Sequence, residues 1–383
     1  MSVRYAVSLV LNVHLPYIRE FPAALKRDPA FIDANHTEEP LPDDISMAPG
    51  SVEESWFFEA LSETYLPLLL LFDRLEADHV PFRLGLSLSP VFVQLLCDDL
   101  LHKKYAAYLD RQIDFGKHEI ERLSGNHDLS LLAKRCFDRA VELRAAFTTR
   151  YEGNIFKAFE HYQRKRKIEF LAAPATHAFL PFLCSYPESL QAQMETALSF
   201  YRYSLGINPQ GFWLPELGWT KELDPFLRSY GFNYTITDSH GFVFGSPPPS
   251  KGSFYPIRTP QGVVVLSRDF NACSDINAMR KEGPYRDNGR DIGFELPTER
   301  LGFFLAQNGA RCQTGYKYWQ TGGDTLYDPD VAEAAAGEHA RIFLENCRNR
   351  LDSALRYMHG MPLSLCAFNA DFFICFLLFP DNI

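Results

Sequence analysis

One carboxylate in this sequence has an unusual setting for a surface acid. Glu216 follows the apolar run QGFWL and lies in the stretch GFWLPELGWT, between Trp213 and Trp219. The flat apolar faces of two tryptophans lower the polarity around a carboxylate and so alter its acid–base behaviour. We therefore expect Glu216 to belong to a functional site and not to an ordinary surface turn.

Other polar residues also follow short apolar runs. The runs that read as β-strands are residues 5–13, 82–88, 167–173, 210–214, 233–237, 262–267 and 364–369. The polar residues at or just after their ends are His14, Ser89, His177, Glu216, Asp238, His240, Asp269, Asn369 and Asp371. In a barrel of parallel strands all carboxyl-terminal ends open on one face, where barrel enzymes keep their catalytic groups. The pattern predicts that these side chains converge there.

Strands that alternate with longer helical stretches favour an α/β fold with a parallel sheet, here closed into a barrel. An open doubly wound sheet is the alternative, although no GxGxxG or GxxxxGK[ST] motif suggests a nucleotide site. Residues 91–165 have almost no strand pattern, so we expect a helical insertion within a barrel domain of residues 1–90 and 166–383. A helix is also expected from about Pro329 to His359.

Composition narrows the choice of partners. The 383 residues carry a net charge of −10 with no long run of one sign, so neither nucleic acid nor an anionic membrane is expected. The eight cysteines are scattered without a CxxC pair, which argues against a zinc ribbon or a disulfide framework. No segment reaches about 18 consecutive apolar residues, and the start of the chain lacks a signal-peptide layout. We expect a cytoplasmic protein with reduced thiols and a neutral or polar small substrate.

Eight stretches of the chain together resemble glycoside hydrolase family 57, and within it the α-glucan branching enzymes. They are HLPYIRE at 14–20, ESWFFEALSETYLPLL at 54–69, LGLSLSPVFVQLL at 84–96, ATHAFLP at 175–181, GFWLPELGW at 211–219, TDSHG at 237–241, RDIGFELP at 290–297 and YKYWQTGG at 316–323. They occur in the family's order over nearly the whole chain. As a set they are highly specific.

The resemblance implies a retaining enzyme that acts on an α-glucan or maltooligosaccharide, on an incomplete (β/α)7 barrel similar to a TIM barrel. Glu216 would be the nucleophile, and a protonated carboxyl about 5–5.5 Å away would act as the acid. The implied substrate contacts come from His14, His177, Trp213 and Trp219. Asp238, His240 and Asp269 are further candidates for the same role. The resemblance implies no metal and no organic cofactor.

The chain departs from the family pattern in three places. The first motif has Asn12 where the family has histidine. The last strand of the family resembles YDAELFGHWW, whereas this chain reads FNADFFICFL, which puts Asn369 at the catalytic aspartate and Asp371 at the following glutamate. An amide cannot donate a proton as a general acid, so we expect weak activity unless a bulge in the strand brings Asp371 into place. Since neither GHWW nor the relatives' C-terminal helical domain follows, we expect a C-terminally shortened chain.

Three functions stay open at this point. The first is an enzyme that branches, transfers or hydrolyses 1,4-α-glucans, with a role in glycogen metabolism. The second is a non-catalytic or vestigial glucan-binding protein, which Asn369 favours. The third is a metal-dependent hydrolase of similar shape that uses His14, Asp238 and His240 as ligands.

Overall fold

The computed structural model describes residues 4–18, 47 and 49–369 of the chain. Its strands form two four-stranded sheets, in the orders β3-β2-β1-β8 and β4-β5-β7-β6. All strand pairs are parallel except β6 with β7. The strands are β1 (Ala6–Val13), β2 (Leu84–Leu88), β3 (Ile168–Leu171), β4 (Gly211–Trp213), β5 (Tyr234–Thr237), β6 (Ile257–Arg258), β7 (Val264–Ser267) and β8 (Leu363–Asn369).

Isolated bridges join the two sheets at both seams. Ala172, just past β3, pairs with Phe212 in β4, and Arg268, just past β7, pairs with Leu365 in β8. At the second seam the backbone N–H of Asp269 donates to the carbonyl of Leu365 at 2.8 Å. The parallel strands β1, β2, β3, β4, β5, β7 and β8 therefore follow one another around an incomplete (β/α)7 barrel, with a single bridge at each seam. This architecture confirms the expected fold class.

Alternating residues of each strand serve two different cores. Val10 and Leu365 belong to a cluster inside the barrel, together with Leu171, Ala173, Trp213, Leu217, Ile236 and Ala367. Leu11 and Val13 instead pack outward against the helices. Because successive side chains of a strand point to opposite faces, burial on both faces explains the nearly continuous apolar runs seen in the sequence.

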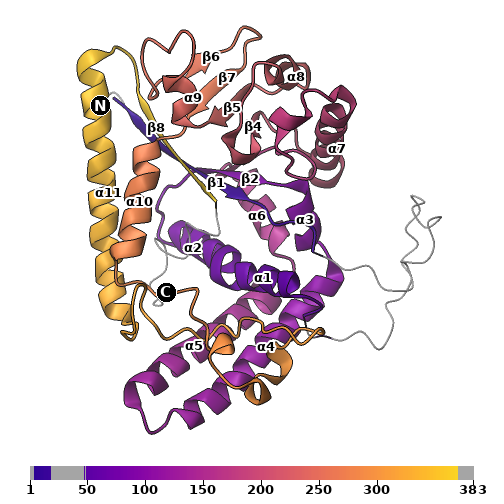
Figure 1. The fold of residues 1–383 in the computed structure, drawn as a ribbon, viewed down its shortest axis with the longest axis vertical. Helices are drawn as coiled ribbons and strands as arrows, with labels where there is room; N and C mark the ends of the chain where they lie inside the picture. The colour runs from indigo at the N-terminus through magenta and orange to yellow at the C-terminus, as the bar shows by residue number, and fades with distance from the viewer. Residues whose placement is uncertain (1–3, 19–46, 48, 370–383) are drawn as a thin grey trace, which may run out of the picture.

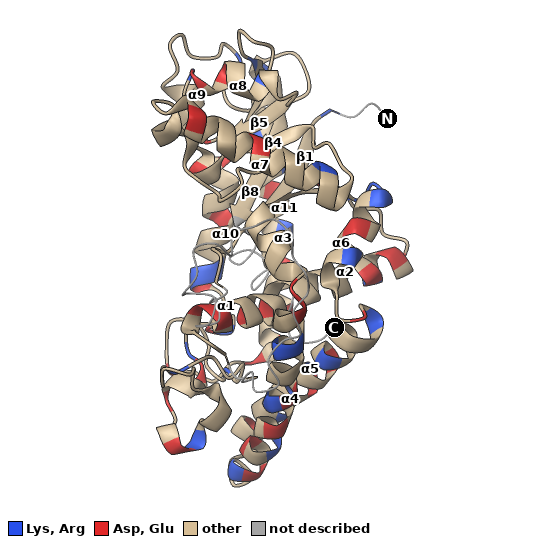
Figure 2. Ribbon diagram, turned by 90° about the vertical axis from the view of Figure 1, so that its right-hand side faces the viewer, with Lys and Arg blue, Asp and Glu red and all other residues tan. Residues whose placement is uncertain are grey.

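The helices between β1 and β3 share one hydrophobic core with these strands. They are α1 (Val52–Ala60), α2 (Leu66–Ala77), α3 (Pro90–Leu96), α4 (Asp99–Arg122), α5 (His127–Ala145) and α6 (Ile155–Arg164), and a π-helical turn, η3 (Leu61–Tyr65), links α1 to α2. Acidic and basic residues alternate along α4 and α5 (Figure 2). The division of the chain into a barrel domain and an insertion of residues 91–165 stays a prediction.

The remaining helices surround the second sheet and β8. They are α7 (Pro187–Leu205), α8 (Leu223–Ser229), α9 (Ser239–Val243), α10 (Phe270–Glu282) and α11 (Pro329–Tyr357). The last of them confirms the helix expected near Pro329. Figure 1 shows α10 and α11 side by side at one edge of the molecule, and the two helices contact each other and β8. The segment between them passes below the barrel beside α4 and α5.

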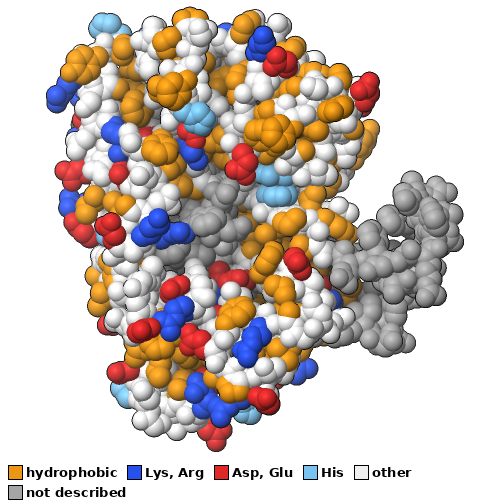
Figure 3. All heavy atoms as spheres, in the orientation of Figure 1, with side chains coloured by type: hydrophobic (Ala, Val, Ile, Leu, Met, Phe, Trp, Pro, Cys, Tyr) orange, Lys and Arg blue, Asp and Glu red, His pale blue; other side chains and the backbone are white. Residues whose placement is uncertain are grey.

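Charged side chains of both signs lie on the surface of the molecule (Figure 3). On the face drawn in Figure 3, acidic and basic side chains are interspersed and neither sign forms an extended patch. None of the helices in the described part of the chain combines the length and apolarity needed to cross a membrane.

Candidate active site

Glu216 lies in a strained turn directly after β4. Glu216 and Leu217 both have a left-handed backbone, each with φ of 54°, and the Glu216 side chain is exposed. Non-glycine residues in this conformation cost on the order of 1–3 kcal/mol each and cluster at functional sites. His177, after β3, is a third such residue, with φ of 57°. Three of the six non-glycine residues with a left-handed backbone in the described part of the chain therefore lie at the candidate site.

A hollow of about 330 Å³ opens beside Glu216 at the carboxyl-terminal ends of the strands. Its lining combines an aromatic ring from β4, an amide from β1, and charged groups from the turn after β4, from the residue after β7 and from α10. The lining residues that matter here are Asn12, Trp213, Glu216, Arg268, Asn277, Arg280, Ala367 and Phe368. Three of the lining side chains carry charge, and two, Trp213 and Phe368, are large aromatic rings. Such a mixture suits a neutral ligand that has both hydroxyl groups and an apolar face.

His14 and His177 form a second feature of the barrel mouth. Their rings stack with centroids 4.0 Å apart and planes 8° from parallel. His14 Nδ1 lies 2.8 Å from Ser89 Oγ, which also accepts the backbone N–H of Phe92. Burial lowers the pKa of His14 to about 4. Burial and the neighbouring His14 lower the pKa of His177 to about 3, so both rings are neutral at pH 7.

Two buried polar atoms near the barrel mouth, His177 Nδ1 and Trp213 Nε1, have no hydrogen-bond partner among the described residues. Trp213 is only 4% exposed. A buried polar atom without a hydrogen bond is unfavourable, and folded proteins leave few of them. Neither atom is accessible to solvent, so a molecule rich in hydroxyl groups would bond to them only after neighbouring side chains move.

Asp238 and Arg268 are paired at the end of β5 and β7. The guanidinium of Arg268 donates to the carboxylate of Asp238, whose other oxygen lies 3.3 Å from His240 Nδ1. Asp238 is buried, whereas the His240 side chain is 73% exposed. The pair brings Arg268, and not Asp238, to the wall of the hollow. Asp238 thus positions a cation next to the space beside Glu216.

Two other predicted contacts lie in different surroundings. The Asp269 carboxylate accepts from the Ala272 N–H at 3.0 Å and from Ser364 Oγ at 2.6 Å, so it caps α10 and ties this helix to β8. Trp219 packs against the hydrophobic cluster of α7 and α8. Neither residue lines the hollow beside Glu216. The structure therefore brings Trp213, but not Trp219, to that space.

Asn369, one of the two candidates for the acid, is the last residue of β8. Asn369 is in register with Asn12 of β1, and the preceding residues Ala367 and Phe368 line the hollow. The backbone of Asn369 is thus at the edge of the same space as Glu216. Asp371 lies outside the described residues.

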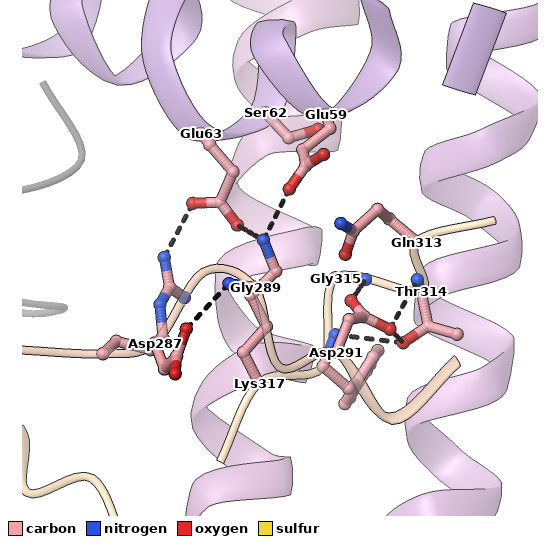
Figure 4. A network of polar contacts seen from close by, with 12 residues as sticks. Glu59, Ser62, Glu63, Asp287, Gly289, Asp291, Gln313, Thr314, Gly315 and Lys317 are labelled. Atoms are coloured by element: carbon pink, nitrogen blue, oxygen red, sulfur yellow. Dashed lines mark hydrogen bonds and ion pairs between the residues drawn. The ribbon is translucent and has the colours of Figure 1, made fainter. Parts of the chain in front are cut away.

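A buried ionic network occupies the segment between α10 and α11 and was missed by the sequence analysis. Lys317 Nζ lies 2.6 Å from Glu59 Oε1 and 3.7 Å from Glu63 Oε1, and its side chain is fully buried. Figure 4 shows Lys317 reaching from the segment toward Glu59 and Glu63 on the helices above it. Beside it, Asp291 accepts from the backbone of Thr314 and Gly315 at 2.9 and 2.7 Å. The network anchors the segment to α1 and η3.

The metal-dependent alternative finds no support in this arrangement. Within residues 4–18, 47 and 49–369, no three His, Cys, Asp or Glu side chains come together as a metal site would require. His14 is stacked on His177, whereas His240 contacts Asp238. The three proposed ligands therefore do not form one site.

Comparison with known proteins agrees with this architecture. The profile of glycosyl hydrolase family 57 matches residues 31–279. The chain is 30% identical to the alpha-amylase AmyC of Thermotoga maritima, with a TM-score of 0.82 over 99% of this chain and 68% of that one. It has the fold of the GH57-type branching enzyme of Pyrococcus horikoshii, at 22% identity and a TM-score of 0.77 over 99% of this chain and 66% of that one.

Curated relatives are longer than this chain. The 1,4-alpha-glucan branching enzyme TK1436 of Thermococcus kodakarensis is 24% identical over 88% of this chain and 48% of its own length. A probable 1,4-alpha-glucan branching enzyme of Mycobacterium tuberculosis is 22% identical over 96% of this chain and 64% of its own length. The chain thus spans between about half and two thirds of these relatives. With a family profile that covers more than half of its residues, it belongs to glycosyl hydrolase family 57.

Proposed function

We propose that this chain acts on 1,4-α-glucans as a retaining hydrolase or glucanotransferase of the branching-enzyme type. The observation that carries the proposal is the position of Glu216 in a left-handed turn at the edge of a hollow that Trp213 and Arg268 also line. The names of the relatives support the choice of substrate. A cytoplasmic location and a role in glycogen metabolism belong to the same proposal.

In this proposal Glu216 attacks the anomeric carbon and forms a covalent glycosyl intermediate. Arg268, held by its ion pair with Asp238, lines the same hollow as the nucleophile. Neutral His14 and His177 bind sugar hydroxyls, because each neutral imidazole has one donor and one acceptor nitrogen. Trp213 offers its Nε1–H as a further donor to the sugar.

The general acid of the reaction is not an aspartate at the position where the family pattern has one. A retaining mechanism needs a second carboxyl about 5–5.5 Å from the nucleophile to protonate the leaving oxygen. The chain has an amide, Asn369, at the position that lies beside Asn12 at the edge of the hollow. We propose that Asp371 supplies the proton in its place, with a rate below that of an enzyme with aspartate at position 369.

The test is the variant Glu216→Gln, measured by release or transfer of maltooligosaccharides from amylose. We expect the variant to lose turnover and to keep maltooligosaccharide binding. Glu222→Gln is the matched control, because Glu222 is an exposed acid of the same connection after β4. Unchanged turnover in Glu216→Gln would eliminate the proposed nucleophile.

A second candidate function is glucan binding without catalysis, which Asn369 favours. It predicts that calorimetry detects maltohexaose binding by the unmodified chain while long incubation with amylose yields no product. It also predicts that Trp213→Ala weakens this binding. Product formation that depends on Glu216 would exclude it.

A further inference from the structure

A second, larger hollow lies at the other end of the barrel. It has a volume of about 610 Å³ and is lined from the first residues of the strands, including Leu84 in β2, Ile168 in β3 and Leu363 in β8. The opening beside Glu216 lies past the strand ends, so the two spaces are at opposite ends of the barrel. A barrel interior is normally packed with side chains, and the amino-terminal end normally serves stability. An open space of this size at the amino-terminal end of the barrel is therefore a candidate ligand site.

The inner wall of this hollow is apolar. Val10, Leu171, Ile236 and Leu365 belong to the barrel cluster and also line the hollow. Tyr234 adds an aromatic ring, whose hydroxyl donates to Glu169 at 2.7 Å. A volume of several hundred Å³ with such walls is typical of a site for a small molecule.

The rim is cationic in a chain that is acidic as a whole. Arg83, Arg166 and Lys167 line the opening, against the single carboxylate of Glu169. Arg83 and Arg166 are exposed and make no ion pair with any described residue, and Lys167 lies 5.2 Å over the ring of Phe82. Neither arginine is paired with a carboxylate of the described residues, and each guanidinium offers a fork of donors that suits a phosphate or carboxylate group.

The backbone of Arg166 supplies an independent observation. Its φ is 58°, in the left-handed region, at the turn where α6 ends. The N–H groups of Arg166 and Lys167 donate to the carbonyls of Gln163 and Tyr162, as in a helix-ending turn that favours glycine. This turn, whose form recurs at His79 after α2, places Arg166 in the lining of the hollow.

We propose that the amino-terminal end of the barrel binds a small amphipathic anion. Its phosphate or carboxylate group pairs with Arg83 and Arg166, and its apolar or aromatic body enters the space lined by Val10, Ile236 and Leu365. The site is distinct from the glucan hollow and does not depend on the proposed function. Its ligand is distinguished from a glucan by charge, because a neutral saccharide gives the two arginines no partner.

The experiment is a calorimetric titration of the full chain at low salt with 1-naphthyl phosphate, 1-naphthoate and the neutral 1-naphthalenemethanol. We expect saturable binding of at least one anion, at least 10-fold tighter than the neutral compound, and weaker binding as salt is added. Preference for the phosphate or for the carboxylate identifies the head group. Equal affinity for all three probes, or no binding at millimolar concentration, would overturn the proposal.

Two variants test the residues. Arg166→Gly removes the guanidinium at a position whose backbone favours glycine, so the fold is retained, and Arg83→Gln removes the second cation. Each is expected to weaken anion binding at least 10-fold, whereas the control Arg356→Ala, an exposed arginine on α11, leaves it unchanged. Wild-type affinity in both rim variants, or displacement of the probe by maltohexaose, would refute this site.

Discussion

The imidazoles of His14 and His177 stack at 4.0 Å between two strand ends that are separated by more than 150 residues of sequence. Their pKa values, about 4 and about 3, lie below the ordinary value of 6.5 because both rings lose water on folding. The unfolded chain therefore binds more protons than the folded chain between the folded and the ordinary pKa values. The two neutral rings therefore do not reduce the free energy of unfolding above about pH 6.5. Below that pH the free energy of unfolding falls, as far as about pH 4, because the unfolded chain takes up protons that the folded chain does not.

Urea denaturation between pH 4.5 and 7.5 measures this effect. Each ring contributes at most about 1.4 kcal/mol per pH unit to the change of the free energy of unfolding with pH. The contribution is smaller in practice because both rings are partly exposed. His14→Gln should flatten the profile, whereas the exposed His240→Gln should not. Identical profiles for His14→Gln and the unmodified chain would show that the ring is not held neutral.

The alternating direction of strand side chains explains which site residues could be read from the sequence. The series of apolar runs correctly predicted the barrel, because a buried strand must stop where polar residues begin. That the polar residues after these runs form a functional site stays a prediction. The sequence pattern does not show which of two adjacent polar residues faces the barrel. Arg268 lines the hollow, whereas Asp269, the next residue, faces α10 and β8.

The sequence pattern could not predict contacts between distant segments, for a different reason. Lys317 and Glu59 are 258 positions apart, and each looks like an ordinary surface residue in its own stretch. Only the packing of the segment against α1 and η3 brings their charges together. The left-handed turn at Glu216 was also invisible, although the proline before it marked the end of the strand.

The indole nitrogen of Trp213 provides a prediction about glucan affinity. Trp213→Phe keeps most of the apolar packing inside the barrel and removes a buried donor that no described residue uses. The loss of one hydrogen bond to a sugar is about 0.5–1.5 kcal/mol, or roughly 2- to 13-fold in the dissociation constant of maltohexaose. Trp219→Phe is the control, since Trp219 packs against α7 and α8 and should leave affinity unchanged.

The identity of residue 369 provides a prediction about rate. Asn369→Asp replaces the amide of the last residue of β8, which directly follows the lining residues Ala367 and Phe368, with a carboxyl that can donate a proton. General acid catalysis contributes roughly 100- to 10,000-fold to a rate. We expect at least about 10-fold faster turnover of amylose, with Asn277→Asp as a control in the same wall. If Asp371 is the acid of the unmodified chain, Asp371→Asn abolishes its activity and spares that of Asn369→Asp.

The buried charges around Lys317 provide a prediction about stability. Arg139, Arg286 and Lys317 outweigh the effect of burial and hold the pKa of Glu63 well below its usual range, whereas burial raises the pKa of Glu59 and of Asp291. Removal of the central cation by Lys317→Met leaves these carboxylates without it, which typically costs about 3–5 kcal/mol in the free energy of unfolding.

Urea denaturation at pH 7 tests Lys317→Met against Lys134→Met, whose partner Asp138 and own side chain are both about half exposed. The control should lose at most about 1 kcal/mol. The contribution of Glu63 is present above its ordinary pKa and is lost as the pH falls. The deficit of Lys317→Met should therefore narrow in acid, where protonation neutralises the carboxylates that the lysine no longer balances. A deficit at pH 7 no larger than that of the control would mean that the segment between α10 and α11 is held by other contacts.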